Sequence, residues 1–68
     1  MTNFRKLTDD GSILGDMAFS PDDGGFYVEV IRRTGRVLGC TEVHPTQDEA
    51  WAAAERMVAE LALELEGV

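Results

Sequence analysis

Cysteine is scarce in this chain: Cys40 is the only one among 68 residues, so no disulfide can form within the chain. A chain of this length buries only a modest core. Such small domains usually gain stability by oligomerisation or by tight packing of a helix on a sheet. A lone thiol is typical of a reducing compartment, which predicts a cytoplasmic protein.

Long apolar runs are also scarce. No run approaches the ~20 residues that a membrane-spanning helix needs. The first residues, MTNFRKLTDDG, include two basic side chains but lack the apolar stretch of a secretory signal. We therefore expect neither a membrane span nor secretion.

Side chains that hold metals or carry out catalysis are few. One cysteine and one histidine are fewer ligands than a zinc site needs, and the paired aspartates lack the alternating ligands of a calcium loop. A nucleophilic pair of Cys40 and His44 would need hydrogen-bond reach and an oxyanion hole, and nothing in the sequence supports either. The sequence predicts no metal, no cofactor and no enzymatic activity.

Basic residues are outnumbered by acidic ones, and the imbalance is uneven along the chain. Six Lys and Arg stand against 13 Asp and Glu, for a net charge of −7. Residues 45–68 hold six acids and one base, whereas residues 1–44 hold seven acids and five bases. This balance argues against direct binding to nucleic acid or to an anionic membrane, and it favours either mere solubility or a partner with a basic surface.

Three turn signals divide the first two-thirds of the chain into short segments of alternating polarity: TDDG, SPDDGG and TG. Pairing across SPDDGG sets Phe19 opposite Phe26 and Met17 opposite Val28. It adds one side of this segment to the core, namely Ile13, Gly15, Met17 and Phe19. The spacing of residues 13–18 also fits one or two helical turns, but the close turns favour a strand. The segment NFRKL within residues 1–8 is either an edge strand or a loose tail.

The turn at Thr34-Gly35 determines the register of the next hairpin. A two-residue turn pairs Val30 with Gly39, whereas a three-residue loop with a bulge would shift the register. With the two-residue turn, one face of the sheet looks buried and holds Phe26, Val28, Val30, Val37, Gly39, Thr41 and Val43. The other face is rather apolar for a surface in contact with solvent. It is either a contact surface for another molecule or an ordinary surface with scattered apolar residues. Its apolar residues are Leu14, Ala18, Tyr27, Ile31, Leu38 and Cys40.

A long helix follows the strands. Thr46 and Glu49 have the spacing of a capping box, and Gly67 is placed to end the helix. Its apolar stripe, with Met57 beside it, is Trp51, Ala54, Val58, Leu61 and Leu65. The predicted fold is α+β: a single domain over residues 1–68, with an antiparallel meander of three or four strands followed by one long C-terminal helix packed on one sheet face.

The acids of this helix are the candidate site. Asp48 and Glu49 suit the first turn, but Glu60 and Glu64 repel each other and Glu64 and Glu66 oppose the macrodipole. Local stability therefore does not account for them. The predicted partner-binding residues, from the helix and from the sheet face away from it, are Asp48, Glu49, Glu55, Glu60, Glu64, Glu29, Glu42 and Leu63.

In size, acidity and layout the whole chain resembles the small, acidic, phage-encoded anti-CRISPR inhibitors. The resemblance implies a non-enzymatic, DNA-mimic-like inhibitor in the host cytoplasm. Its partner would be a basic nucleic-acid-handling protein such as a CRISPR effector subunit. The alternative rests on FYVEVIRRTGRVLGCTEVHPTQDEAWAAAERMVAEL, whose strand–strand–helix order is similar to HicB-type antitoxins. That likeness implies a small homodimeric regulatory or antitoxin-like interaction module.

Overall fold

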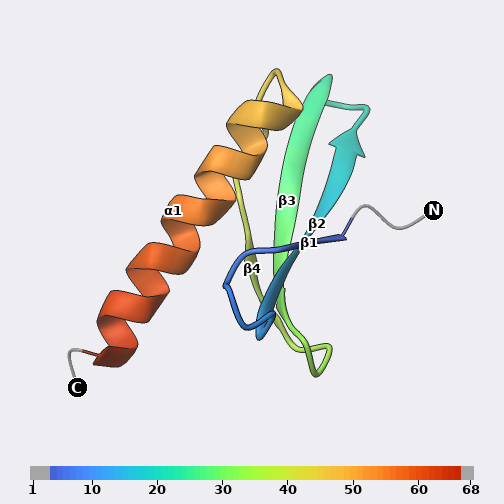
Figure 1. The fold of residues 1–68 in the computed structure, drawn as a ribbon. Helices are drawn as coiled ribbons and strands as arrows, with labels where there is room; N and C mark the ends of the chain where they lie inside the picture. The colour runs from blue at the N-terminus through green and yellow to red at the C-terminus, as the bar shows by residue number, and fades with distance from the viewer. Residues whose placement is uncertain (1–3, 67–68) are drawn as a thin grey trace.

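The computed structural model describes the backbone of residues 4–66 and the side chains of residues 4–61. It contains four strands and a helix: β1 (Phe4–Lys6), β2 (Ile13–Ser20), β3 (Gly25–Arg32), β4 (Val37–Cys40) and α1 (Gln47–Glu66). The strands form one antiparallel sheet in the order β1-β2-β3-β4, and α1 packs on one face of it (Figure 1). The predicted α+β fold is confirmed. Phe4–Lys6 is an edge strand, and residues 13–20 are a strand throughout.

The register of β2 and β3 is the predicted one. Phe19 lies opposite Phe26 and Met17 opposite Val28. The two phenylalanine rings meet edge to face, with their centroids 5.3 Å apart. The prediction that Phe19 joins the core is wrong, because its side chain is 56% exposed and packs on Phe26 at the end of the hairpin.

The register of β3 and β4 is predicted correctly only in its middle. Gly35 N–H donates to Arg32 O and Arg32 N–H donates to Arg36 O, both at 2.7 Å, so the loop has three residues instead of two. A bulge compensates for this extra residue: Ile31 pairs with Val37, while Val30 still pairs with Gly39. The three-residue alternative is therefore the observed one.

The bulge exchanges the faces of two β4 residues. Val37, expected on the core side, is 56% exposed, since its partner Ile31 lies on the open face. Leu38, expected on the open face, is the additional bulged residue and packs against the core. Further along, Phe26 pairs with His44 and not with Val43, so Val43 is exposed as well.

Helix α1 begins where the capping signal places it. Glu49 N–H donates to Thr46 Oγ1 at 3.2 Å, and Ala50 N–H donates to Thr46 O at 3.2 Å. An N-cap of this kind stabilises a helix by about 1 kcal/mol. Gly67, the predicted terminator, lies outside the described residues, as does the side chain of Leu65.

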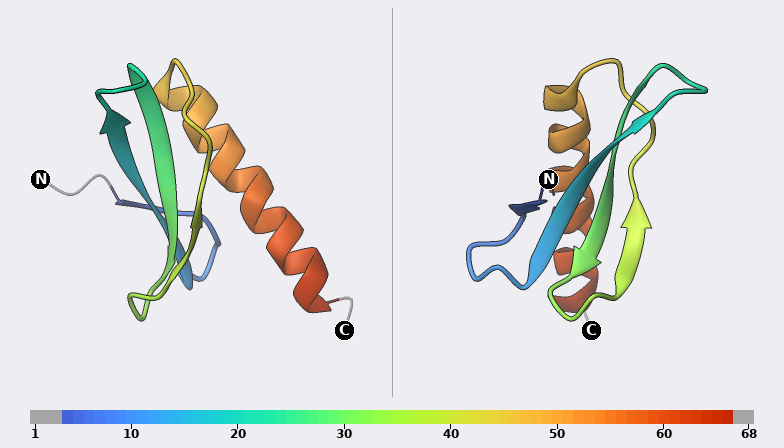
Figure 2. Two further views of the ribbon diagram at one scale, coloured as in Figure 1. Left: turned by 180° about the vertical axis from the view of Figure 1, so that it is seen from behind. Right: turned by 90° about the vertical axis from the view of Figure 1, so that its right-hand side faces the viewer.

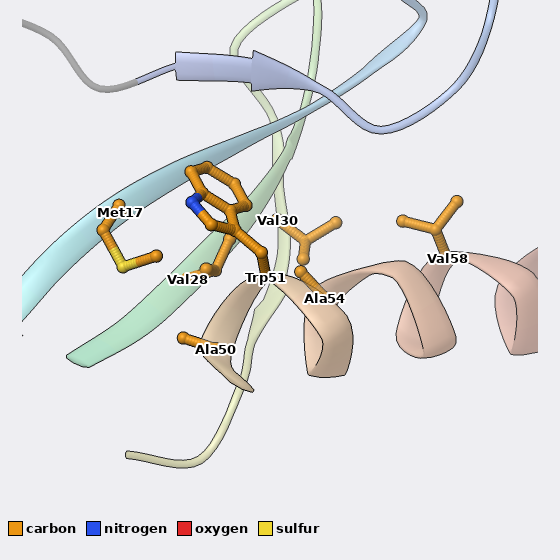
Figure 3. Packing of buried hydrophobic residues seen from close by; sticks show 7 residues of the cluster. All are labelled: Met17, Val28, Val30, Ala50, Trp51, Ala54 and Val58. Atoms are coloured by element: carbon orange, nitrogen blue, oxygen red, sulfur yellow. The ribbon is translucent and has the colours of Figure 1, made fainter. Parts of the chain in front are cut away.

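The core lies between the first half of α1 and strands β2 and β3. Figure 3 shows Trp51 reaching from α1 toward the strands, within the cluster of Met17, Val28, Val30, Ala50, Trp51, Ala54 and Val58. Glycines allow this close approach: a Cβ on Gly15 would lie 2.8 Å from Trp51 Cζ3, and one on Gly39 would lie 2.8 Å from Met57 Cε. Farther along, α1 leans away from the strands (Figure 2).

Candidate functional site

The acidic side chains that α1 presents are exposed. Asp48 and Glu49 lie in its first turn, Glu55 and Glu60 follow, and all four are accessible to solvent. Arg56 is the single basic residue of the helix, and the last turn contains none. These four acids have the exposure that the sequence-based prediction requires.

The predicted site residues do not form one continuous patch. Glu55 and Glu60 are five residues apart, which places them about 140° apart around the helix axis. Glu29 lies on the sheet face that α1 does not cover. The side chains of Glu64 and Leu63 lie outside the described ones, so their part of the predicted site has no structural description.

An open groove of about 320 Å³ brings two of the predicted acids together. Glu42, from the connection after β4, and Glu60, from α1, both line it, together with Arg56 of α1. The complete lining is Cys40, Thr41, Glu42, His44, Ala53, Arg56, Met57 and Glu60. The groove combines an apolar part with carboxylates and one guanidinium.

Cys40 and His44 share this groove, although the sequence offered no reason to pair them. The backbone of His44 exchanges two hydrogen bonds of 2.7 Å with Phe26, and Cys40 is an exposed thiol on the edge strand. Among the hydrogen bonds that the structure describes, none joins the two side chains. Their proximity in one groove therefore does not constitute a nucleophilic pair.

The open face of the sheet carries a pair of acids, of which the sequence-based prediction included Glu29 but not Asp16. Asp16 lies directly opposite Glu29, and both side chains are half-buried. Like charges in opposite positions on neighbouring strands destabilise a sheet. Pairing Met17 with Val28 already implied this contact, so the signal for Asp16 was present in the predicted register.

Basic side chains gather at the tip of the β3–β4 hairpin. Arg32, Arg33 and Arg36 are all exposed, and residues 30–41 contain no acid. The net charge of −7 over the whole chain gives no indication of this basic cluster, which is found only by counting charges segment by segment. Arg5 differs, since its guanidinium lies 4.3 Å from the ring centroid of Trp51 as a cation–π contact.

Asp10 has a structural role in the β1–β2 loop. Its Oδ1 accepts hydrogen bonds from the Ser12 N–H at 3.0 Å and from the Thr8 hydroxyl at 2.7 Å. These bonds, with the Ser12 N–H as the largest contribution, lower the pKa of Asp10 from 3.8 to about 2. The charged form of Asp10 therefore holds the loop.

Metal-binding and membrane-spanning features are absent from the described part of the chain. No three His, Cys, Asp or Glu side chains among those described are grouped so that they could hold a metal ion. Between residues 4 and 66, no helix has both the length and the apolar character for crossing a membrane.

Comparison with known proteins returns no relative. No family model, no curated protein sequence and no solved structure matches this chain.

Proposed function

We propose that this protein is a non-enzymatic inhibitor whose acidic surface binds a basic, nucleic-acid-binding surface of another protein. The observation that carries the proposal is the exposure of Asp48, Glu49, Glu55 and Glu60 on one helix with a single base. A CRISPR effector subunit is one partner of this kind, as the likeness to anti-CRISPR inhibitors implies.

The helix suits this role because it holds the carboxylates at fixed spacings. From Asp48 to Glu60 the axis advances by about 18 Å, since each residue of an α-helix rises 1.5 Å. A basic groove that binds a nucleic-acid backbone presents several Lys and Arg side chains over a comparable length. Charge of this kind speeds the encounter and aligns the partners, and it is weakened by salt.

The open sheet face supplies apolar contacts beside further acids. Tyr27, Ile31 and Leu14 are half-buried there, next to Asp16 and Glu29. Buried apolar and aromatic anchors usually carry most of the energy of an interface, while rim charges steer the approach. A partner that pairs a cation with Asp16 and Glu29 would also relieve their mutual repulsion.

The test compares two variants of equal net charge. Glu55→Gln with Glu60→Gln removes two carboxylates of α1, and Asp9→Asn with Asp22→Asn removes two exposed carboxylates of the loops. A partner is first captured from the source cell on the immobilised wild-type protein and then purified. Its affinity for each variant, and its displacement from labelled DNA or RNA by each variant, are measured at several salt concentrations.

We expect the helix variant to bind at least about tenfold more weakly than the loop variant, because two charge contacts are worth roughly 1.4 kcal/mol. Equal affinities of the two variants would show that net charge alone, and not the α1 surface, determines binding. A partner that binds this protein and nucleic acid at the same time would contradict the inhibitory role.

A further inference from the structure

The two edge strands of the sheet are protected to different degrees. β1 is three residues long and carries Arg5 and Lys6. β4, the opposite edge, reads VLGC and contains neither a charged residue nor a proline. Natural sheets guard their edges with charge, proline, bulges or short strands, because an open edge pairs readily with another strand. A bulge at Leu38 interrupts the β4 edge at one point, and the chain beyond it is extended.

The backbone of this edge has groups available for a further strand. On its inner side, Thr41 N–H donates to Val28 O at 2.9 Å, and His44 exchanges hydrogen bonds with Phe26. Successive residues of an antiparallel strand bond alternately to one side and the other. The N–H and C=O of Cys40, which precedes Thr41, therefore point away from β3.

The charge along this edge changes sign from one end to the other. Arg36 stands just before β4, with Arg32 and Arg33 at the same hairpin tip, and all three are exposed. Glu42 stands just after β4, and Glu60 faces the same groove. A second copy that runs antiparallel brings the basic end of each edge beside the acidic end of the other, so the edge is complementary to itself.

We propose that two copies of this chain pair antiparallel along β4, with the two-fold axis at Cys40, so that two four-stranded sheets become one. In this register the N–H and C=O of Cys40, which point away from β3, bond to those of Cys40 of the partner subunit. The arginine end of each β4 then lies beside the glutamate end of the other, and symmetry repeats this contact. An axis at Gly39 would instead place the outward groups of Cys40 opposite Leu38 of the partner subunit, and the bulge leaves Leu38 on the side of Val30, so the backbone selects the axis at Cys40.

This dimer extends a small domain in the plane of its sheet. The largest fully buried side chains of one chain are those of Val28 and Val30, and association is a usual way to stabilise so small a core. The outward face of α1 remains free in the dimer. The inference therefore does not depend on the proposed function, and each can fail without the other.

The test is a charge swap read out by sedimentation equilibrium. Wild-type protein should dimerise as its concentration rises. Arg36→Glu alone and Glu42→Arg alone should each weaken the dimer by about tenfold, because the two-fold axis applies every change twice. The double variant Arg36→Glu/Glu42→Arg should recover most of the affinity, since it restores opposite charges in the same positions. Circular dichroism confirms that each variant is folded.

A control variant distinguishes this edge from the open sheet face. Ile31→Lys places a charge on the open face and should leave the dimer intact, while amide exchange at Cys40 should slow as the dimer forms. A wild-type protein that stays monomeric at every concentration would overturn the proposal. So would a dimer that Ile31→Lys abolishes, or single variants whose defects the double variant does not repair.

Discussion

The two faces of the sheet arise from the same strands but carry different kinds of side chain. The face under α1 contains Val28 and Val30, which have no exposed surface, and Gly15, which admits the ring of Trp51. The open face has half-buried apolar residues around the like-charged pair of Asp16 and Glu29. Stability therefore depends mainly on the covered face.

The largest effect should come from removing core volume on the covered face. Val30→Ala deletes two buried methyl groups and should cost about 2–3 kcal/mol, from lost transfer energy and the cavity left behind. Val37→Ala is the matched control, because it makes the same change at a valine that is 56% exposed, and it should cost less than about 0.5 kcal/mol. Urea unfolding midpoints measure both, and equal losses would contradict the assignment of Val37 to the open face.

A smaller effect should follow from filling the gap at Gly15. Gly15→Ala places a methyl group 2.8 Å from Trp51 Cζ3 and 2.9 Å from Val28 Cγ1, so packing must shift. The expected loss is about 1–2 kcal/mol, typical of a modestly overpacked core. In a Trp51→Phe background the same substitution should cost less, since the smaller ring leaves room. An equal cost in both backgrounds would show that contact with the indole is not the cause.

The smallest effect should come from a residue on neither face. Because hydrogen bonds lower the pKa of Asp10 to about 2 in the folded state, its contribution to stability is complete above pH 3.8 and is lost as the pH falls toward 2. Asp10→Asn should therefore reduce the melting temperature slightly at pH 7 and lessen its decline between about pH 4 and pH 2. Asp9→Asn, in the same loop, is the control, and an identical pH profile for both variants would exclude this role of Asp10.

Much of the fold could be predicted because its signals are local. Alternating polarity and the SPDDGG turn predicted the β2–β3 pairing, and Thr46 predicted the start of α1. The β3–β4 register was harder, since a two-residue and a three-residue loop at Thr34-Gly35 are both compatible with the residues. The bulge that follows from the longer loop moved Val37 outward and Leu38 inward.

The candidate site was predictable in composition but not in arrangement. Sequence alone identifies the acids of the helix, and periodicity places Asp48, Glu49 and Glu60 away from the apolar stripe and Glu55 nearer its boundary. It does not show that Glu42 shares a groove with Glu60, because these residues belong to separate elements. The arginines at the hairpin tip could have been identified as a basic cluster from the sequence, but the strongly negative total charge gives no indication of them.

The sequence by itself determined the order of strands and helix, the pairing of β2 with β3, the helix cap and the acidic character of α1. Each of these follows from residues close together in the chain, through turn chemistry, side-chain alternation and capping. Only the tertiary structure decided which β4 residues face the core, which acids lie near one another and how β4 is left as an open edge. Those features depend on one extra residue in a loop and on how the helix leans across the sheet, and both are set by packing between distant segments.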